Sequence, residues 1–339
     1  MRARRLFADL VANLAVLLVL ALLFEGILRV LYAHSLDFDM EMWKYAARLK
    51  HSVDNPKLSF VHVPNGHEFL MGVDVRTNSQ GLRDNEYSLT KAPGIYRIMM
   101  LGDSTTLGWG VPLKDTAAKV LERALNESHV PGHQRFEVIN AGVGNYDTVQ
   151  EVAYYQTRGK SFHPDLVILV YFINDPEPVP KENKGLLVDR SYLVAFLVSR
   201  FRALQGMMGR RPDWKAYYHS LYDETRPGYQ ACKTALKDLA DTTRDDGAEV
   251  LVALLPELRH INGNYPFAEE HQRIKDVLKP EGVPVVDLID GLRDHGPEST
   301  LWVTPADDHP NSKANALVAA QLQDWIVRNL TEARKKRKP

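Results

Sequence analysis

The chain has 339 residues, which is enough for one sizeable α/β domain with additional segments. Its 42 lysine and arginine residues nearly balance its 43 aspartate and glutamate residues, so no excess of charge indicates a nucleic-acid surface. The lone cysteine, Cys232, excludes an intramolecular disulfide and any cysteine-based zinc cluster.

The N-terminus departs from this balanced composition. Residues 1–9 carry Arg2, Arg4 and Arg5, and an apolar stretch over residues 10–32 follows them. That stretch reaches about 20 residues, the length a helix needs to cross the hydrocarbon core of a bilayer. We therefore predict a transmembrane anchor over 10–32. Because the arginines precede it, the N-terminus is expected in the cytoplasm and the remaining chain outside, in the periplasm or the extracellular space.

Two charged residues interrupt the apolar stretch near its far end. Glu25 and Arg29 stand four residues apart, so on a helix their side chains can pair. The alternative to an anchor is a cleaved signal peptide, for which Ala33 and Ser35 offer small residues at a processing site. The apolar part is longer than in most signal peptides, which favours a retained anchor.

The next segment, residues 33–93, is a lead-in in which alternation over 69–77 predicts short strands. A domain over 94–330 follows, where short apolar runs alternate with segments of helical period. Continuous apolar strands of this kind predict a parallel five-stranded sheet with helices on both faces. The predicted strands are 97–101, 136–139, 166–172, 250–255 and 283–288, and the predicted helices are 115–127, 147–159, 228–245, 267–279 and 312–330.

One long insertion, residues 176–227, separates the third and fourth predicted strands. An insertion of this size beside a site is often a lid or a specificity element, and a helix that only packs on the domain is an equal alternative. The basic end, residues 331–339, is interpreted as a solvated tail that could also touch anionic lipid or polymer.

Polar motifs follow the predicted strands. The first strand ends in Gly102-Asp103-Ser104, and a serine at such a strand-to-helix turn is exposed at the carboxyl edge of the sheet, where backbone N–H groups can meet an oxyanion. Three further blocks come in order along the chain: Asn-Ala-Gly-Val-Gly-Asn at 140–145, Phe-Ile-Asn-Asp at 172–175 and Asp-Asp-His-Pro-Asn at 307–311. The order of the four blocks is far more specific than any block alone.

Over residues 97–330 this order resembles the SGNH, or GDSL-like, hydrolase family. The resemblance implies a three-layer α/β/α flavodoxin-like sandwich in which Ser104 attacks an ester carbonyl and His309 is the general base. It also implies an oxyanion hole made by the Ser104 N–H, a glycine N–H of the second block and the Asn174 side chain. These roles fit acyl transfer, because a neutral serine needs a base and the developing oxyanion needs donors.

The second block departs from the family pattern. Alignment of the block puts Asn145 where the family has the glycine whose N–H enters the oxyanion hole. Asparagine tolerates a left-handed backbone better than other non-glycine residues, so the hole can survive. The N–H that points inward is that of either Gly144 or Asn145.

The fourth block departs in its acid. The usual family spacing places aspartate three residues before the histidine, but Ala306 is there. A triad needs one carboxylate near the distal ring nitrogen and no fixed spacing. We favour Asp307, with Asp308 or a Ser–His dyad as alternatives. Asp103 is interpreted as a residue that orders the loop carrying Ser104.

These observations predict a serine esterase or deacylase of the cell envelope that uses an acyl-enzyme and acts on O-acylated carbohydrate or lipid. One alternative is a polysaccharide O-acetyltransferase with the same triad, and a second is a catalytically silent binding or assembly protein on the same fold. No Walker loop or metal-ligand spacing is visible, so no cofactor, no metal and no nucleic-acid partner are expected.

Overall fold

The computed structural model describes residues 2–128, 130, 132–179, 189–206 and 213–337. The chain divides into two compact units. We call Met1–Leu49, Glu68–Gly72 and Asn183–Pro212 the N-terminal unit. The sheet unit comprises Lys50–His67, Val73–Glu182 and Asp213–Pro339. The insertion predicted at 176–227 is thus shared between the units, and part of it lies outside the described residues.

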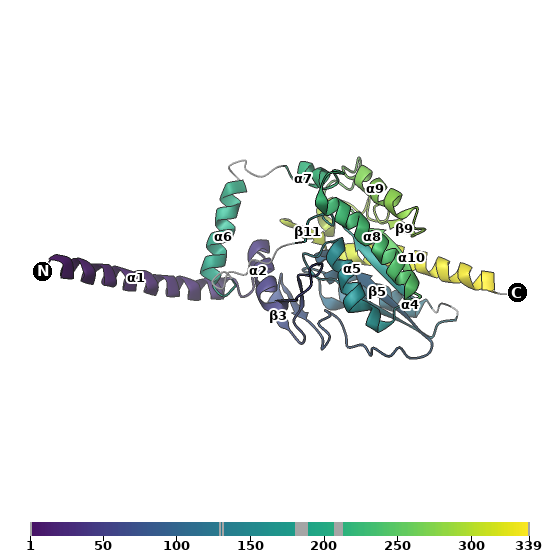
Figure 1. Cartoon of the computed structure of the whole chain (residues 1–339), viewed down its shortest axis with the longest axis horizontal. Coiled ribbons are helices and arrows are strands. Elements are labelled where there is room, and N and C mark those ends of the chain that lie inside the picture. The colour runs from purple at the N-terminus through teal and green to yellow at the C-terminus, as the bar shows by residue number, and fades with distance from the viewer. Residues whose placement is uncertain (1, 129, 131, 180–188, 207–212, 338–339) are drawn as a thin grey trace. The chain divides into compact units, whose positions relative to one another are not determined.

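A parallel five-stranded sheet forms the centre of the sheet unit, as the sequence predicts (Figure 1). The strand order is β6-β5-β7-β8-β9, which is the flavodoxin-like order in which the chain starts next to one edge and reverses direction once. The strands are β5 (Ile95–Leu101), β6 (Arg135–Asn140), β7 (Leu166–Tyr171), β8 (Glu249–Leu254) and β9 (Val285–Asp287). The fold-class prediction is confirmed.

Helices cover both faces of this sheet. On one face α4 (Ala117–Glu127) packs against α10 (Ser312–Arg337), and on the other α5 (Thr148–Thr157) packs against α8 (Pro227–Asp245). Helix α9 (Ala268–Leu278) contacts β9 and α8. Helix α10 continues past the predicted end at residue 330 as far as Arg337, so the described part of the predicted basic tail belongs to its last turns.

Burial explains why the strands read as continuous apolar runs. All six residues of β7 are buried, and Val167, Ile168 and Leu169 are fully enclosed. A strand with helices over both of its faces has no solvent side, so polar residues cannot alternate along it. Polar side chains therefore appear where the strands end, which is where an open parallel sheet places its ligands.

The lead-in contains more structure than the alternation over 69–77 predicts. Strands β3 (His67–Leu70) and β4 (Val73–Arg76) confirm that prediction. An unpredicted antiparallel pair, β1 (Lys50–Ser52) with β2 (Phe60–His62), belongs to the sheet unit, and its register places Lys50 opposite His62. Helix α2 (Phe38–Leu49), also unpredicted, belongs to the N-terminal unit.

The N-terminal unit is built around α1 (Arg2–Leu31), whose segment Arg4–Leu31 is long and apolar enough to cross a membrane. Helix α6 (Tyr192–Gln205), from the insertion, packs against α1 and α2. Glu25 and Arg29 form the ion pair that their spacing predicts, with 2.8 Å between Arg29 Nη2 and Glu25 Oε1.

Shorter elements complete the sheet unit. The helix α3 (Ser104–Leu107) follows β5 directly, and α7 (Trp214–Leu221) is the second described helix of the insertion. The antiparallel pair β10 (Trp302–Thr304) and β11 (Asp307–Pro310) precedes α10. The 3₁₀ turns are η1 (Leu113–Asp115), η2 (Gly159–Phe162) and η4 (Glu298–Leu301).

Candidate active site

The turn from β5 into α3 presents Ser104. Gly102 leaves no room for a side chain, because a Cβ there would lie 2.1 Å from Thr106 Oγ1. Asp103 is the N-cap of α3, and its Oδ1 accepts hydrogen bonds of 2.8 Å from both the backbone N–H and the hydroxyl of Thr105. Ser104, 7% exposed, is thereby held at the first position of the helix.

Ser104, His309 and Asp307 form a continuous chain of hydrogen bonds. Ser104 Oγ lies 2.8 Å from His309 Nε2, and His309 Nδ1 lies 2.6 Å from Asp307 Oδ1. An ionised carboxylate can only accept, so the Nδ1 proton is directed at Asp307 and Nε2 is left to accept from the serine hydroxyl. This is the arrangement of a nucleophile, a base and the group that orients the base.

The spacing of Asp307 and His309 follows from their position in β11. Side chains two residues apart in a strand lie on the same face, so Asp307 and His309 both point toward Ser104. Asp308, between them, makes an ion pair of 2.9 Å with Arg259 Nε. Arg259 is also held by Glu257, whose Oε1 is 3.0 Å from the same nitrogen. The structure therefore brings Asp307 to His309 and places Asp308 in a separate ion-pair cluster.

Trp109 donates a hydrogen bond to Asp307, and no motif in the sequence indicates this role. The indole Nε1 donates to Asp307 Oδ2 at 3.1 Å, while the Trp109 backbone N–H donates to the Ser104 carbonyl at 3.0 Å. Trp109 is only 2% exposed. One buried residue thus connects the carboxylate to the turn that carries the serine.

Two opposing effects set the basicity of His309. Burial by itself lowers the pKa of this imidazole, and the hydrogen bond and charge of Asp307 raise it. Asp103 and Asp308 add to the second effect, so the net pKa of His309 is raised above its ordinary value. The charged partner stabilises the imidazolium that forms when His309 takes a proton.

The second block is pressed against the nucleophile turn. Gly142 has no space for a side chain, since a Cβ there would lie 2.3 Å from the backbone nitrogen of Leu107. A four-residue turn follows, closed by a 3.1 Å hydrogen bond from Tyr146 N–H to the Val143 carbonyl. Asn145, its third residue, has φ 64°, the left-handed backbone that a type II turn requires there. Asparagine thus occupies a position that favours glycine.

Lys50, which belongs to the lead-in, hydrogen-bonds to this turn, and no motif in the sequence indicates this contact. Its ammonium donates to the Gly144 carbonyl at 2.5 Å and to Asn145 Oδ1 at 2.9 Å, and it lies 4.0 Å from the centroid of the Phe60 ring. Lys50 is 7% exposed. In a trans peptide the C=O and N–H point in opposite directions, so fixing the Gly144 carbonyl also fixes the Asn145 N–H on the other side.

Asn174 follows β7 and is joined to the nucleophile turn. Its side chain donates a hydrogen bond to the Asp103 carboxylate. Burial raises the pKa of Asp103, and the hydrogen bonds from Thr105 and Asn174 oppose that rise. An amide nitrogen carries two hydrogens, so Asn174 can serve Asp103 with one and keep the second for another acceptor.

Helix α7 connects the third and fourth blocks. Tyr217 donates from its hydroxyl to Glu177 Oε1 at 2.7 Å, just after the third block. Trp214 lies under the guanidinium of Arg259, with 4.3 Å from Arg259 Cζ to the ring centroid. Arg259 in turn binds Asp308, the neighbour of His309. This part of the insertion therefore contacts a residue just after the third block and, through Arg259, the neighbour of His309.

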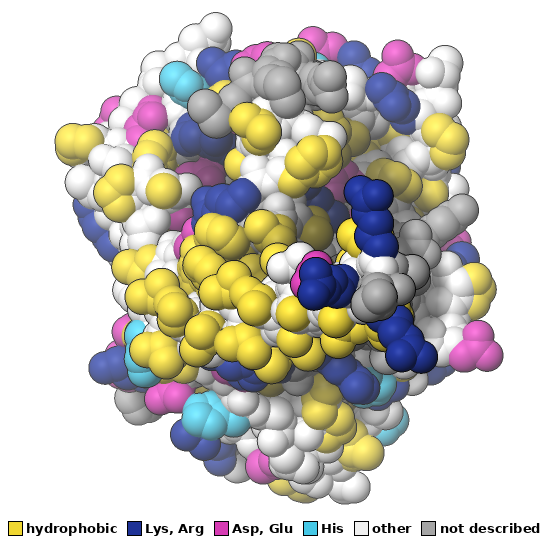
Figure 2. Space-filling view, turned by 90° about the vertical axis from the view of Figure 1, so that its left-hand side faces the viewer, with side chains coloured by type: hydrophobic (Ala, Val, Ile, Leu, Met, Phe, Trp, Pro, Cys, Tyr) yellow, Lys and Arg dark blue, Asp and Glu magenta, His cyan; other side chains and the backbone are white. Residues whose placement is uncertain are grey.

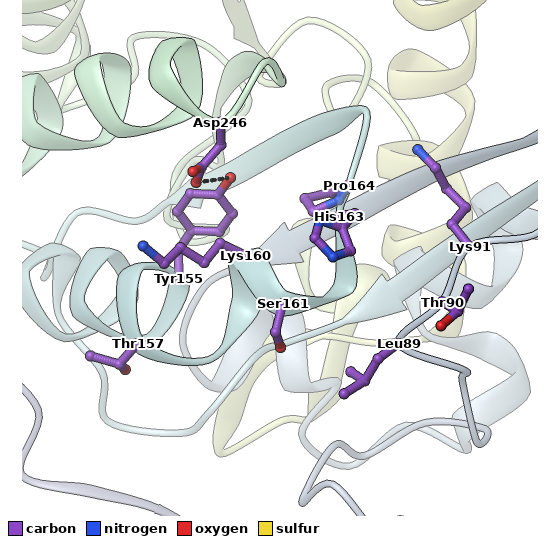
Figure 3. Close-up of a pocket in the computed structure, with 10 residues that line it drawn as sticks. All are labelled: Leu89, Thr90, Lys91, Tyr155, Thr157, Lys160, Ser161, His163, Pro164 and Asp246. Carbon is purple, nitrogen blue, oxygen red and sulfur yellow. Dashed lines mark hydrogen bonds between the residues drawn. The ribbon is translucent and has the colours of Figure 1, made fainter.

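A separate hollow lies at the other end of the sheet. Figure 3 shows its lining, in which the Tyr155 hydroxyl donates to Asp246 Oδ2 at 3.1 Å. His163 and Pro164 in this hollow stand just before β7, at its amino end. Ser104 and Asn174 follow the carboxyl ends of their strands, so the hollow belongs to a different edge of the sheet.

We see no set of metal ligands in the part of the chain that the structure describes. No group of three or more His, Cys, Asp or Glu side chains there is arranged to hold an ion. The only cysteine, Cys232, is buried on α8, and burial raises the pKa of its thiol.

The chain is similar to a known protein family and to several solved structures. The family model described as GDSL-like Lipase/Acylhydrolase family matches residues 100–317. No curated protein matches the chain. A solved two-domain esterase active on acetylated mannans is 18% identical, with 70% of this chain and 50% of that chain covered and a TM-score of 0.45.

Two further solved structures have similar values. The psychrotrophic esterase EstA from Pseudoalteromonas sp. is 14% identical, with 69% of this chain and 98% of that chain covered and a TM-score of 0.43. A lipase/acylhydrolase from Enterococcus faecalis is 14% identical, with coverages of 69% and 96% and a TM-score of 0.42. The family match spans well over half of the chain and includes the serine turn and β11. The chain belongs to the GDSL-like lipase/acylhydrolase family and is a hydrolase that acts on ester bonds.

Proposed function

We propose that this hydrolase is a membrane-anchored serine esterase of the cell envelope, which forms an acyl-enzyme on Ser104 and acts on O-acylated carbohydrate or lipid. The observation that carries the proposal is the chain of hydrogen bonds from Ser104 Oγ through His309 to Asp307, at 2.8 Å and 2.6 Å. A hydroxyl, an imidazole and a buried carboxylate in this order are what acyl transfer needs.

The reaction follows from the protons these groups hold. Ser104 Oγ attacks the acyl carbon while His309 Nε2 takes the hydroxyl proton. The ester C–O bond then breaks, and the same proton passes to the departing alkoxide. Water repeats the sequence on the acyl-enzyme and releases the acid. Asp307 holds the ring and stabilises its positive charge throughout.

The oxyanion formed in each half-reaction needs donors. We assign them to the Ser104 N–H, the Asn145 N–H and Asn174 Nδ2. The Lys50 contact with the Gly144 carbonyl supports Asn145 over the Gly144 N–H, because it fixes the peptide that joins them. The second hydrogen of the Asn174 amide supports the third assignment.

The packing of α1 supports a retained anchor over a cleaved signal peptide. Leu28, near the end of α1, is 7% exposed and belongs to a small core with Met40, Tyr192 and Ala195. A leader removed by cleavage would leave this core without one of its members. An anchored location favours substrates at the outer face of the membrane. Sequencing of the mature protein tests the anchor directly, because a retained anchor leaves the N-terminus intact.

The test uses the full chain in lipid nanodiscs with an activated acetyl ester. Wild type, Ser104→Ala and His309→Ala are compared, and the same samples are labelled with a fluorophosphonate. We expect each substitution to lower the rate by several orders of magnitude and Ser104→Ala to abolish labelling. Folded wild-type protein with neither turnover nor labelling would overturn the proposal. Acetylation of an added glycan at the expense of hydrolysis would show that the acyl acceptor is a sugar hydroxyl.

A further inference from the structure

Helix α6 has two different apolar faces. The buried residues of α6 are Tyr192, Ala195 and Ser199, and Tyr192 and Ala195 share a small core with Leu28 of α1 and Met40 of α2. A second stripe of α6 is exposed: Leu197 is 56%, Phe201 60% and Leu204 51% exposed. These positions are spaced by four and three residues, so they form one continuous stripe along the helix. Large apolar side chains that are exposed to water add nothing to the packing of α6 on α1 and α2.

The start of α6 is fixed to one level of α1. Glu25 accepts hydrogen bonds from the N-cap residue and the first two residues of α6: Ser191 Oγ at 2.9 Å, Tyr192 N–H at 3.1 Å and Leu193 N–H at 2.9 Å. A carboxylate in an apolar helix is thus satisfied by the amino end of another helix. Glu25 precedes the end of α1 by six residues, about 9 Å of helix. The beginning of α6 therefore lies beside the last turns of α1.

Further contacts keep α6 on this side of α1. Phe196 packs near Tyr32, with ring centroids 6.1 Å apart, and Arg200 forms an ion pair with Asp37. Within this unit α6 runs crosswise to α1 (Figure 1). If α1 crosses a bilayer, a helix that crosses its outer end runs along the membrane surface.

The exposed stripe of α6 is apolar, as is the surface of the anchor helix α1. The apolar side chains of α1 are exposed along the helix, for example Leu20 at 45% and Phe24 at 55%. Figure 2 shows a broad gathering of hydrophobic side chains on this face of the molecule, with lysine and arginine side chains beside it. Arg202, the residue after Phe201, is also exposed, and its long side chain can reach lipid headgroups.

We propose that α6 is a membrane-interface helix, which lays Leu197, Phe201 and Leu204 into the boundary between headgroups and acyl chains of the outer leaflet. The proposal rests on the membrane anchor of the proposed function and adds a second contact with the same bilayer. Its partner is the lipid surface, because the stripe starts at the level of the last turns of α1 and carries no acidic side chain. This part of the insertion would hold the N-terminal unit at the membrane surface.

The test places a nitroxide label on the full chain in nanodiscs of phosphatidylcholine and phosphatidylglycerol. Cys232 is fully buried, so wild type serves as the unlabelled background. Phe201→Cys reports on the stripe, Leu20→Cys on the anchor, and Lys237→Cys, whose side chain is 57% exposed on α8, on an aqueous position. Labelled variants must retain turnover of a soluble ester, which shows that they are folded.

Two relaxing agents read the surroundings of each label: oxygen, which concentrates in lipid, and a water-soluble nickel chelate. We expect the Phe201→Cys label to favour oxygen several-fold more than the Lys237→Cys label does, at a depth shallower than Leu20→Cys. A label at 201 that is open to the chelate overturns the proposal, even with position 20 in lipid. Low access to both agents would show a protein cover, such as a second copy, and also overturns it. Water around position 20 would instead refute the anchor itself.

Discussion

Two parts of the site depart from the family pattern, β11 and the turn at 143–146, and they are stabilised in different ways. In β11 the carboxylate that reaches His309 is two residues away, and the alternation of a strand is enough to put Asp307 and His309 on one face. In the turn, the backbone of Asn145 has φ 64° and depends on Lys50, which is 95 residues earlier in the sequence. The first departure is resolved locally and the second by a distant residue.

The two regions also act on different parts of the reaction: β11 acts on the base, and the turn at 143–146 acts on the oxyanion. Asp307 touches the imidazole directly, whereas Lys50 touches the peptide that joins Gly144 to Asn145. We therefore expect substitutions in β11 to alter proton transfer and its pH dependence. Substitutions around the turn should alter stabilisation of the transition state and leave the base unchanged.

The largest effect is expected from Asp307→Asn. The amide can hold the ring in the wrong tautomer, so Nε2 no longer accepts from Ser104, and kcat should fall by about 10⁴-fold. Asp308→Asn is the matched control one residue away, because Asp308 forms its ion pair with Arg259. Steady-state hydrolysis of an activated ester measures both. Equal losses in the two variants would show that the acid is shared or that a dyad operates.

Lys50→Met is expected to act on kcat more than on KM. Without the ammonium the Gly144–Asn145 peptide can rotate, which misplaces one oxyanion donor, and losing such a donor costs about 10²-fold or more in rate. Lys50→Arg is the control, since it keeps a cation able to donate to the Gly144 carbonyl and should recover part of the rate. Fluorophosphonate labelling and the pH profile distinguish a misplaced donor from a lost base. A Lys50→Met variant with the kcat of wild type would remove the turn from the mechanism.

The sequence was most informative where an interaction is local. Buried strands such as β7 follow from continuous apolar runs, and the position of Ser104 follows from a strand that ends in Gly-Asp-Ser. Lys50 and Trp109 had no such signal, because the hydrogen-bond partners of their side chains are far away in sequence and neither residue type marks a site. The lead-in was predicted as a connecting segment for the same reason, although β1 and β2 belong to the sheet unit.

The pH dependence of turnover should report the raised pKa of His309. The neutral imidazole is the active base, so kcat/KM rises with pH, and its ascending limb should lie above the ordinary histidine value of 6.5. Asp308 adds to the rise, so Asp308→Asn should move the limb slightly to lower pH and change the plateau rate by less than about tenfold. A limb at or below pH 6.5 in wild type would contradict the stabilised imidazolium. Lys50→Met should leave the limb where it is, which keeps the two regions separable.

The smallest effect is expected in stability, from Asn145→Ala compared with Asn145→Gly. Both variants lose the 2.9 Å contact between Asn145 Oδ1 and Lys50, but only alanine must pay the steric cost of φ 64°, which is about 1 kcal/mol. Asn145→Ala should therefore unfold at a lower denaturant concentration than Asn145→Gly in detergent micelles. Both keep the backbone N–H, so their turnover should stay close to that of wild type if Lys50 still holds the Gly144 carbonyl. A glycine variant as unstable as the alanine variant would mean that the side-chain contact, and not the backbone conformation, is what asparagine contributes to the turn.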